Sequence, residues 1–284
     1  MDYETADGSQ FSLREEWSDD AESPQFLGTL ITAFVDGNAY VGKSTHGLDD
    51  LDEQDVFDLL EPVPSDNIFP IFSDDLTQAP PFDTDEHYLK APQFTYEDRQ
   101  PGRTFVADRM RNEATTLELL SEKPHPSLAK YYGCVVKDGR VTHLSLARYH
   151  CNLVQHVQVG LSEEDCDRIL EQLRSGLEYL HGLGIAHNDI NPGEDVALAD
   201  DVDWADFAPE NVCIDASGHA VIIDFDSAAP FGEALVKGRS TRQISDPEND
   251  FEGLQLIHDF LFNLVRDPAE EDFDDMSPLN AASI

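Results

Sequence analysis

One segment restricts the fold of this chain more than any other: residues 162–184, SEEDCDRILEQLRSGLEYLHGLG. Its apolar residues recur every three or four positions, which places them on one side of a helix. They are Cys166, Ile169, Leu170, Leu173, Leu177 and Leu180. Ser162, with Asp165 three residues later, has the pattern of a capping box, and Gly182 or Gly184 can end the helix. The segment therefore predicts a long helix with one buried face.

The sequence after this helix is interrupted. Residues 187–212 read HNDINPGEDVALADDVDWADFAPENV, and residues 193–209 within them carry six acids and no base. Without these 17 residues, the sequence runs on as HNDINPENV. Two explanations stay open. The segment is either an acidic regulatory insertion or an unspliced intron. The second explanation fits because its 17 codons make 51 nucleotides (17 × 3), a length typical of introns, and the reading frame stays open across them. In both cases the residues on either side of the break belong to one motif.

The charge of the chain limits its partners. With 58 acidic and 18 basic residues among 284, the formal net charge is −40. Such a surface repels nucleic acid and anionic lipid and favours a basic partner. Residues 1–65 carry 16 acids and two bases, and residues 267–284 carry six acids and no base, a composition typical of solvated surface. We therefore exclude nucleic-acid binding and expect a protein partner to be basic.

Cysteine spacing and hydropathy indicate the compartment. Cys134, Cys151, Cys166 and Cys213 lie 15 or more residues apart and form no Cys-x-x-Cys pair, which is typical of buried thiols in a reducing compartment. The chain has no basic-then-apolar leader and no run of 18 apolar residues, so neither secretion nor membrane insertion is predicted. An intracellular protein, cytoplasmic or nuclear, is expected.

Local patterns predict the remaining elements. Residues 1–25 lack periodicity and are expected to be disordered, and residues 62–81 form a linker rich in Pro and Asp with one short strand at 67–72. Asp-Gly pairs favour hairpin turns, which are predicted at Asp36-Gly37 and Asp138-Gly139. Further expected elements are a hairpin at 26–41, a strand at 86–92, a helix at 111–122, a strand pair at 131–146, a hairpin at 211–225 and a helix at 248–265.

Residues 37–44, GNAYVGKS, match the phosphate-loop pattern G-x-x-x-x-G-K-[ST]. A working phosphate loop lies between a buried strand and a helix whose N-terminal amides face the phosphates. Here the segment overlaps the predicted hairpin, and the acidic sequence from Asp49 onward would repel a phosphate. We therefore reject this match as a nucleotide site.

Without residues 193–209, the second half of the chain resembles the catalytic core of eukaryotic protein kinases. The catalytic loop of that family, H-R-D-L-x-x-x-N, is present as HNDI at 187–190 followed by Asn211, and the D-F-G motif is present as DFD at 224–226. Asn211 and Asp224 are 13 residues apart, the length of one hairpin. The phrases LGIAHNDINP, IIDFDSAAPFGE and ENDFEGL more narrowly resemble small, divergent kinase-like proteins of filamentous fungi.

This resemblance implies an α+β, two-lobed protein-kinase-like fold with a truncated C-lobe and an acidic N-terminal extension. It assigns residues 1–65 to the extension with its β-hairpin, 66–150 to the N-lobe and 151–266 to the truncated C-lobe, with 193–209 as an acidic insertion in the catalytic loop and 267–284 as an acidic tail. Asp250 stands where the family anchors its lower lobe.

The resemblance also implies roles for five residues, and with them ATP and Mg²⁺ as cofactors. Asp189 is the expected catalytic base, which accepts the proton of the substrate hydroxyl. Asn211 and Asp224 are the expected metal ligands. Lys90 is expected to hold the α and β phosphates of ATP, with Glu113 orienting it. The implied activity is phosphoryl transfer from ATP to a Ser/Thr-type hydroxyl of a protein.

Departures from the family pattern leave other readings open. Residues 71–88 contain no glycine, so the glycine-rich loop over the phosphates is missing, and the acids of 193–209 would repel a triphosphate. Asn188 and Asn191 replace an arginine and a lysine, which argues against control by activation-loop phosphorylation. Asp226 replaces the glycine of D-F-G, as in small-molecule kinases. The alternatives are a pseudokinase that serves as a binding module and, with less support, a small-molecule kinase.

Overall fold

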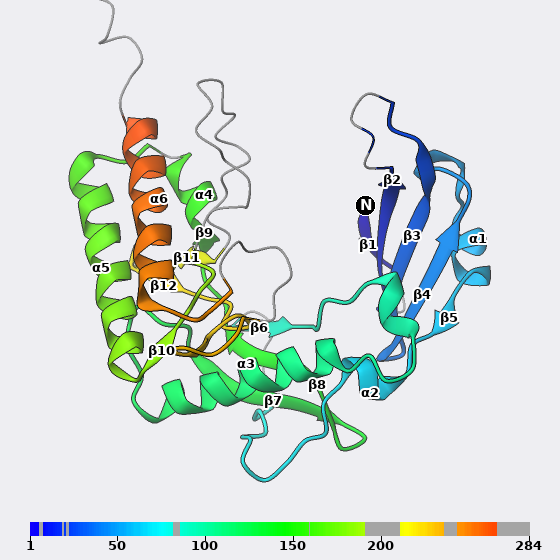
Figure 1. The fold of residues 1–284 in the computed structure, drawn as a ribbon, viewed down its shortest axis with the longest axis horizontal. Coiled ribbons are helices and arrows are strands. Elements are labelled where there is room, and N and C mark those ends of the chain that lie inside the picture. The colour runs from blue at the N-terminus through cyan, green and yellow to red at the C-terminus, as the bar shows by residue number, and fades with distance from the viewer. Residues whose placement is uncertain are drawn as a thin grey trace, which may run out of the picture. The chain divides into compact units, whose positions relative to one another are not determined.

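A computed structural model describes residues 1–5, 8–18, 20, 23–81, 86–158, 160–190, 211–235 and 243–265. The chain forms two compact units (Figure 1). The first unit is Met1–Lys123 with Lys130–Arg148, and the second is Pro124–Ala129 with Tyr149–Ile284. Helices and sheets are mixed in both, so the fold is α+β, consistent with a kinase-like fold. The expected insertion at 193–209 and the tail at 267–284 lie outside the described residues.

The first unit begins with a five-stranded antiparallel sheet in the order β1-β2-β3-β4-β5. Its strands are β1 (Asp2–Glu4), β2 (Gln10–Trp17), β3 (Phe26–Val35), β4 (Asn38–Ser44) and β5 (Glu61–Pro62). The predicted hairpin is confirmed as β3 and β4, and both turn residues, Asp36 and Gly37, have positive φ (50° and 73°) as such a turn requires. The expected disorder of residues 1–25 is wrong, because β2 pairs with β3 along its whole length.

Burial explains why β2 forms. Phe11 and Leu13 face the same side as Ile31 of β3 and are buried against α1 (Glu53–Asp58) through Val56. A short polar strand of this kind gains its stability from packing on its neighbours, which a local pattern does not reveal. The rejection of the phosphate loop is confirmed, because residues 37–44 are turn and strand and the next element is a short 3₁₀ helix, Leu48–Asp50.

The segment 62–81 differs from its prediction. Instead of a strand at 67–72, it contains the short helix α2 (Ser65–Ile68) and two isolated bridges, from Ile71 to Arg140 and from Gln78 to Cys134. Asn67 is buried and its Nδ2 donates to the carbonyl oxygens of Asp98 (2.6 Å) and Gln100 (2.8 Å). These bonds, to a 3₁₀ helix some 30 residues further on, fix a helical turn that the apolar sequence did not indicate.

A second sheet in the first unit has the order β6-β8-β7. Its strands are β6 (His87–Lys90), β7 (Tyr131–Lys137) and β8 (Arg140–Ala147). Helix α3 (Phe105–Glu122) packs on β7 and begins six residues before its predicted start. All these predicted elements are confirmed, including the turn at Asp138 and Gly139, where φ is 51° and 75°. Of the expected Lys-Glu pair, Lys90 lies on β6 and Glu113 lies on α3.

The second unit centres on two long helices, α5 (Glu163–Gly182) and α6 (Pro247–Val265), which lie side by side (Figure 1). Ser162 and Asp165 form the predicted capping box, and the predicted apolar face of α5 is buried. The smaller elements are β9 (Cys151–Asn152), α4 (Leu153–Val157), β10 (Ile185–Ala186), β11 (Val212–Ile214), β12 (Ala220–Ile222) and β13 (Ala229–Pro230). The predicted hairpin at 211–225 is confirmed as β11 and β12.

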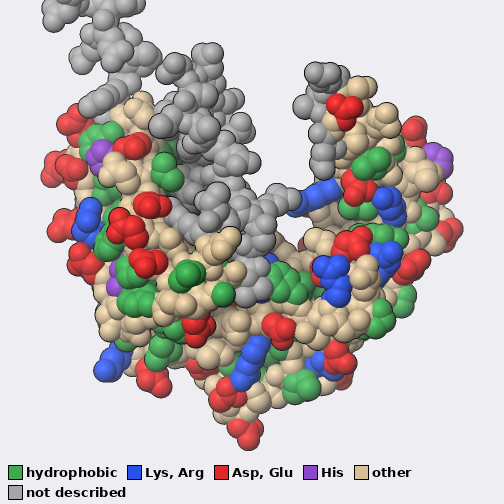
Figure 2. Space-filling model, in the orientation of Figure 1, with side chains coloured by type: hydrophobic (Ala, Val, Ile, Leu, Met, Phe, Trp, Pro, Cys, Tyr) green, Lys and Arg blue, Asp and Glu red, His purple; other side chains and the backbone are tan. Residues whose placement is uncertain are grey.

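The surface is acidic, and the cysteine thiols are free. Figure 2 shows Asp and Glu side chains spread over the visible face of both units, in keeping with 58 acidic against 18 basic residues. All four cysteines are free; Cys134 and Cys166 are buried, whereas Cys151 and Cys213 are half-buried. None of the helices in the described ranges has the length and apolar run needed to cross a membrane.

Candidate active site

The first unit holds Lys90 and Glu113 together. Lys90 lies on β6, and its Nζ donates to both carboxylate oxygens of Glu113 on α3, at 2.7 and 2.6 Å. The side chain of Glu113 is only 4% exposed and that of Lys90 20%. Glu113 falls on the buried face of α3 between Met110 and Leu117, as helical spacing dictates. A buried carboxylate is stable only with such a partner, so the pair fixes the position of the ammonium group.

The catalytic loop of the second unit is anchored by Asp250 on α6. This carboxylate is fully buried, and the backbone amides of His187 and Asn188 donate to its two oxygens at 2.8 and 2.7 Å. Nε2 of His181, in the last turn of α5, lies 2.7 Å from Oδ2. Asp250 therefore holds the end of α5 and the backbone immediately before Asp189, as the resemblance implied.

The ring of His187 connects the loop to the strand that leads to Asp224. Its Nδ1 accepts from the backbone amide of Asp189 (3.3 Å), so the proton lies on Nε2, which donates to the carbonyl of Ile223 (3.0 Å). The ring also packs edge-to-face on Phe225, with centroids 5.1 Å apart. Both ring nitrogens are used in structure, so this histidine positions the loop.

The structure brings together Asp189, Asn211 and the end of the β11-β12 hairpin. Nδ2 of Asn211 donates to the carbonyl of Asp189 (2.6 Å) and to its Oδ2 (3.2 Å). The amide of Ile223 donates to the carbonyl of Asn211 (3.0 Å), so Asn211 and Asp224 flank the same end of the hairpin. Because the amide nitrogen of Asn211 faces Asp189, its oxygen faces the other way.

The backbone at Asp224 is left-handed, with φ of 63°, which is uncommon outside glycine. The amide of Asp226 lies 3.4 Å from Oδ1 of Asp224, and Ser227 donates its hydroxyl to Oδ1 of Asp226 (2.8 Å). Asp226 itself is not among the positive-φ residues. An aspartate therefore fits this position without the backbone strain that replacing a glycine can cause.

The donor set at this end of the hairpin suits magnesium. A carboxylate from Asp224 and an amide oxygen from Asn211 are hard oxygen ligands of the type that Mg²⁺ prefers. Within the described ranges, no three or more His, Cys, Asp or Glu side chains gather as a metal site. Mg²⁺ in nucleotide enzymes needs fewer protein ligands, because one or two of them are enough when water and phosphate oxygens complete the coordination shell. The residues present therefore fit this ion.

The five predicted site residues divide between the units. Lys90 and Glu113 pair within the first; Asp189 and Asn211 are in contact within the second, where Asp224 follows the hairpin that begins after Asn211. Sequence reasoning missed the hydrogen bonds of the Asn188 side chain, which reach Ser245 and Asn249. The local signal was weak: asparagine is enriched in left-handed backbone, and Asn188 has φ of 65°.

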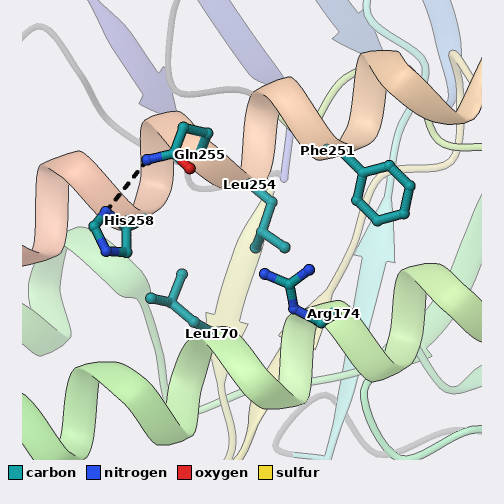
Figure 3. Close-up of a pocket in the computed structure, with 6 residues that line it drawn as sticks. All are labelled: Leu170, Arg174, Phe251, Leu254, Gln255 and His258. Atoms are coloured by element: carbon teal, nitrogen blue, oxygen red, sulfur yellow. Dashed lines mark hydrogen bonds between the residues drawn. The ribbon is translucent and has the colours of Figure 1, made fainter.

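A separate cavity lies between α5 and α6 (Figure 3). It measures about 230 Å³ and is lined by Leu170, Arg174, Phe251, Leu254, Gln255 and His258. Gln255 Nε2 lies 3.4 Å from Nδ1 of His258 on α6. None of the five predicted site residues is among these six side chains, so the cavity is separate from the contact between Asp189 and Asn211.

Part of the chain is similar in sequence to known protein kinases. No protein-family model matches it. It is 28% identical over 154 residues, 52% of the chain, to MAP kinase kinase kinase win1 of Schizosaccharomyces pombe, covering 9% of that protein. It is 28% identical over 122 residues, 42% of the chain, to ribosomal protein S6 kinase alpha-2 of Mus musculus, covering 14% of it. It is 24% identical over 157 residues, 53% of the chain, to MAP kinase kinase kinase SSK2 of Saccharomyces cerevisiae, covering 8% of it.

These similarities support a kinase-like superfamily and, at that level, a kinase-like function. The matched part of the chain spans 8 to 14% of the length of these three relatives. They come from yeasts and a mammal, so the narrower resemblance to proteins of filamentous fungi stays a prediction.

Proposed function

We propose that this protein is an ATP- and Mg²⁺-dependent protein-kinase-like phosphotransferase that acts on a Ser/Thr-type hydroxyl. The observation that carries the proposal is the contact of Asn211 with Asp189, at the end of the hairpin that Asp224 also flanks. Phosphoryl transfer needs a carboxylate near the hydroxyl and oxygen ligands for magnesium, and this arrangement supplies both kinds of group. The buried Lys90-Glu113 pair gives further support.

Each residue has a physical task in this proposal. Asp189 accepts the proton of the attacking hydroxyl, and the amide of Asn211 on its Oδ2 fixes the direction in which the carboxylate points. Asn211 and Asp224 would hold Mg²⁺, which neutralises the phosphate charge when bound. Lys90 holds the α and β phosphates, and Glu113 prevents its ammonium group from moving away. Catalysis then rests on positioning and electrostatics.

The substrate is proposed to be a basic intracellular protein. At a net charge of −40, long-range attraction increases the encounter rate with positively charged partners and suppresses that with nucleic acid. The missing glycine-rich loop removes backbone amides that would close over the phosphates, so we expect a high KM for ATP.

A pseudokinase is the second candidate. In this reading the fold binds a protein partner and transfers no phosphate. The missing glycine loop and the six acids of residues 193–209 favour it, because both weaken triphosphate binding. A small-molecule kinase has the single support of Asp226 in the third position of the metal motif.

The melting temperature with and without ATP and Mg²⁺ separates these readings. At ATP tenfold above its Kd, binding stabilises the protein by about 1.4 kcal/mol, which raises Tm by about 3 to 5 °C. The chain as written is compared with one that lacks residues 193–209. A Mg²⁺-dependent rise in Tm in both chains supports an enzyme that works with residues 193–209 in place. A rise only in the shortened chain supports a kinase core that these residues impair. No shift in either folded chain refutes the proposal and favours the pseudokinase.

Two substitutions make the assay specific. Asp224→Asn is expected to remove the Mg²⁺ dependence of the shift, because it replaces a carboxylate ligand by an amide. Asp189→Asn is expected to keep the shift and lose phosphoryl transfer by at least about 1000-fold. Asp167→Asn, the same change at an exposed position of α5, is the matched control and should alter neither quantity.

A further inference from the structure

We propose that Asn188 is a positioning residue that orients Asp189 by clamping residues 227–229 and 244–249 to the catalytic loop through neutral hydrogen bonds. The inference rests on the proposed function, because it concerns the regulation of the same site. Its consequence is that the loop is assembled in the unmodified chain, with no phosphate required.

The amide nitrogen of Asn188 lies within hydrogen-bond distance of three oxygen atoms, which share its two hydrogens. Nδ2 lies 3.0 Å from the carbonyl of Ala186, 3.1 Å from the carbonyl of Ser227 and 3.0 Å from Oγ of Ser245. Ser227 follows the metal motif by one residue, and Ser245 precedes α6 by two. One side chain thus links three segments that are up to 57 residues apart in sequence.

The amide oxygen of Asn188 accepts from the same region. Nδ2 of Asn249 donates to Oδ1 at 2.9 Å, and the backbone amide of Asp246 lies 3.4 Å away. Asn188 and Asn249 are each 8% exposed, so these bonds are shielded from water. Only an amide offers two donor hydrogens and an acceptor in this shape, so neither an aspartate nor a leucine can replace all of these bonds.

Ser245 extends the clamp. Its hydroxyl donates to the carbonyl of Ala229 (2.8 Å), its carbonyl accepts from the amide of Gly232 (2.8 Å), and its own amide donates to the carbonyl of Glu233 (2.8 Å). Ser245 is 1% exposed. The residues that follow the metal motif are therefore joined to those that precede α6, and both are joined to Asn188.

The link to Asp189 runs through the backbone. Asn188 has φ of 65°, and its amide donates to Oδ1 of Asp250 at 2.7 Å. The next residue is Asp189, whose amide bonds to His187. Because Asn188 is held by both its backbone and its side chain, it fixes the direction in which the chain enters Asp189. Hydrogen bonds between neutral groups need no added charge to form.

Two variants of Asn188 test this clamp. Asn188→Asp keeps the size but turns a donor into an acceptor that faces the oxygens of Ala186 and Ser227. Asn188→Gly keeps the left-handed backbone and the bond to Asp250 but removes the amide. Asn263→Asp, on an exposed position of α6, is the matched control. Ser245→Ala, which removes a single hydroxyl, is a milder variant for the case in which the Asn188 variants fold poorly.

Hydrogen exchange and steady-state kinetics are the readouts. We expect the amides of Gly232 and Ser245 to exchange at least about tenfold faster in the Asn188 and Ser245 variants than in the control. We expect kcat to fall by about 100-fold in Asn188→Asp, with KM for ATP unchanged, because Lys90 is not altered. Protein treated with phosphatase should keep its full rate.

Three results would overturn the inference: exchange rates like those of the control, a change confined to KM, or a rate lost on phosphatase treatment. The melting shift of the unaltered chain with ATP and Mg²⁺ is measured in parallel. If that shift is absent, the proposed function fails, whereas the exchange comparison still decides whether Asn188 clamps these segments.

Discussion

Replacing Asp250 by asparagine should strongly destabilise the second unit. The carboxylate is fully buried and is contacted by three donors: the amides of His187 and Asn188, and Nε2 of His181. An asparagine keeps most bonds if its oxygen takes the place of Oδ2, where two of the donors converge. Its NH₂ group then faces the amide of Asn188, and two buried donors oppose each other.

The magnitude follows from these bonds. A buried amide left without an acceptor costs about 1 to 3 kcal/mol, and each of the two remaining bonds loses about 1 kcal/mol when its acceptor is no longer charged. The expected loss is therefore about 3 to 5 kcal/mol, within the range seen when one partner of a buried charged pair is removed. For a unit of this size it corresponds to a fall in Tm of about 10 °C or more.

Scanning calorimetry at neutral pH measures this change. Asp259→Asn, an exposed acid on the same helix, is the control and should stay within about 0.5 kcal/mol of the unaltered chain. His181→Gln keeps a donor near Oδ2 and should cost less than Asp250→Asn. If Asp250→Asn is as stable as Asp259→Asn, the view that this carboxylate holds the catalytic loop is refuted.

Three further predictions concern single side chains. Glu113→Gln replaces one oxygen beside the ammonium of Lys90 by an NH₂ group, so kcat/KM for ATP should fall by about 10- to 100-fold in a steady-state assay while Asp167→Asn leaves it unchanged. A methyl group at Gly176 of α5 would lie 3.1 Å from Cβ and 3.2 Å from the carbonyl of Ser127, whereas one at Gly182 meets nothing within 4 Å. Gly176→Ala should therefore lower the free energy of unfolding by about 1 to 3 kcal/mol, and Gly182→Ala should raise it by up to about 1 kcal/mol; denaturant titrations that rank them the other way contradict this packing. Burial raises the pKa of the Cys213 thiol from its ordinary value of 9.0 to about 11. Between these two values the thiol ionises in the unfolded chain before it ionises in the folded one, so the free energy of unfolding falls as the pH rises from 9.0 to about 11. Unfolding midpoints across this pH window should fall less steeply in Cys213→Ala, and equal slopes would exclude the effect.

Local patterns identified the long helices and the main hairpins of the fold. The apolar face of α5 and its cap at Ser162 are encoded within about 20 residues, so their chemistry could be recognised without knowing any neighbour. The same holds for the turns at Asp36-Gly37 and Asp138-Gly139, where two adjacent residues adopt positive φ. The spacing of Asn211 and Asp224 was informative for a similar reason, because one short hairpin separates them.

Elements stabilised by distant partners could not be recognised in this way. Residues 10–17 look like a polar, disordered segment until β3 pairs with them, and residues 65–68 become helical where Asn67 bonds to a carbonyl 31 residues away. Neither partner can be deduced from a periodic pattern, since pairing between strands and side-chain contacts depends on which surfaces meet.

The sequence by itself therefore determined the long helices and the main hairpins, because these depend on periodicity and turn residues, and its resemblance to protein kinases implied which residues lie near Asp189. Only the tertiary structure showed which hydrogen bonds hold that loop, both at Asp250, whose anchoring position the resemblance implied, and at Ser245, which no pattern indicated. Asp250 and Ser245 reach it from 62 and 57 residues away, and the two-donor, one-acceptor geometry that selects Asn188 exists only once those segments are folded together. Hydrogen bonds of a few ångströms between residues so far apart are a property of packing, which no local pattern records.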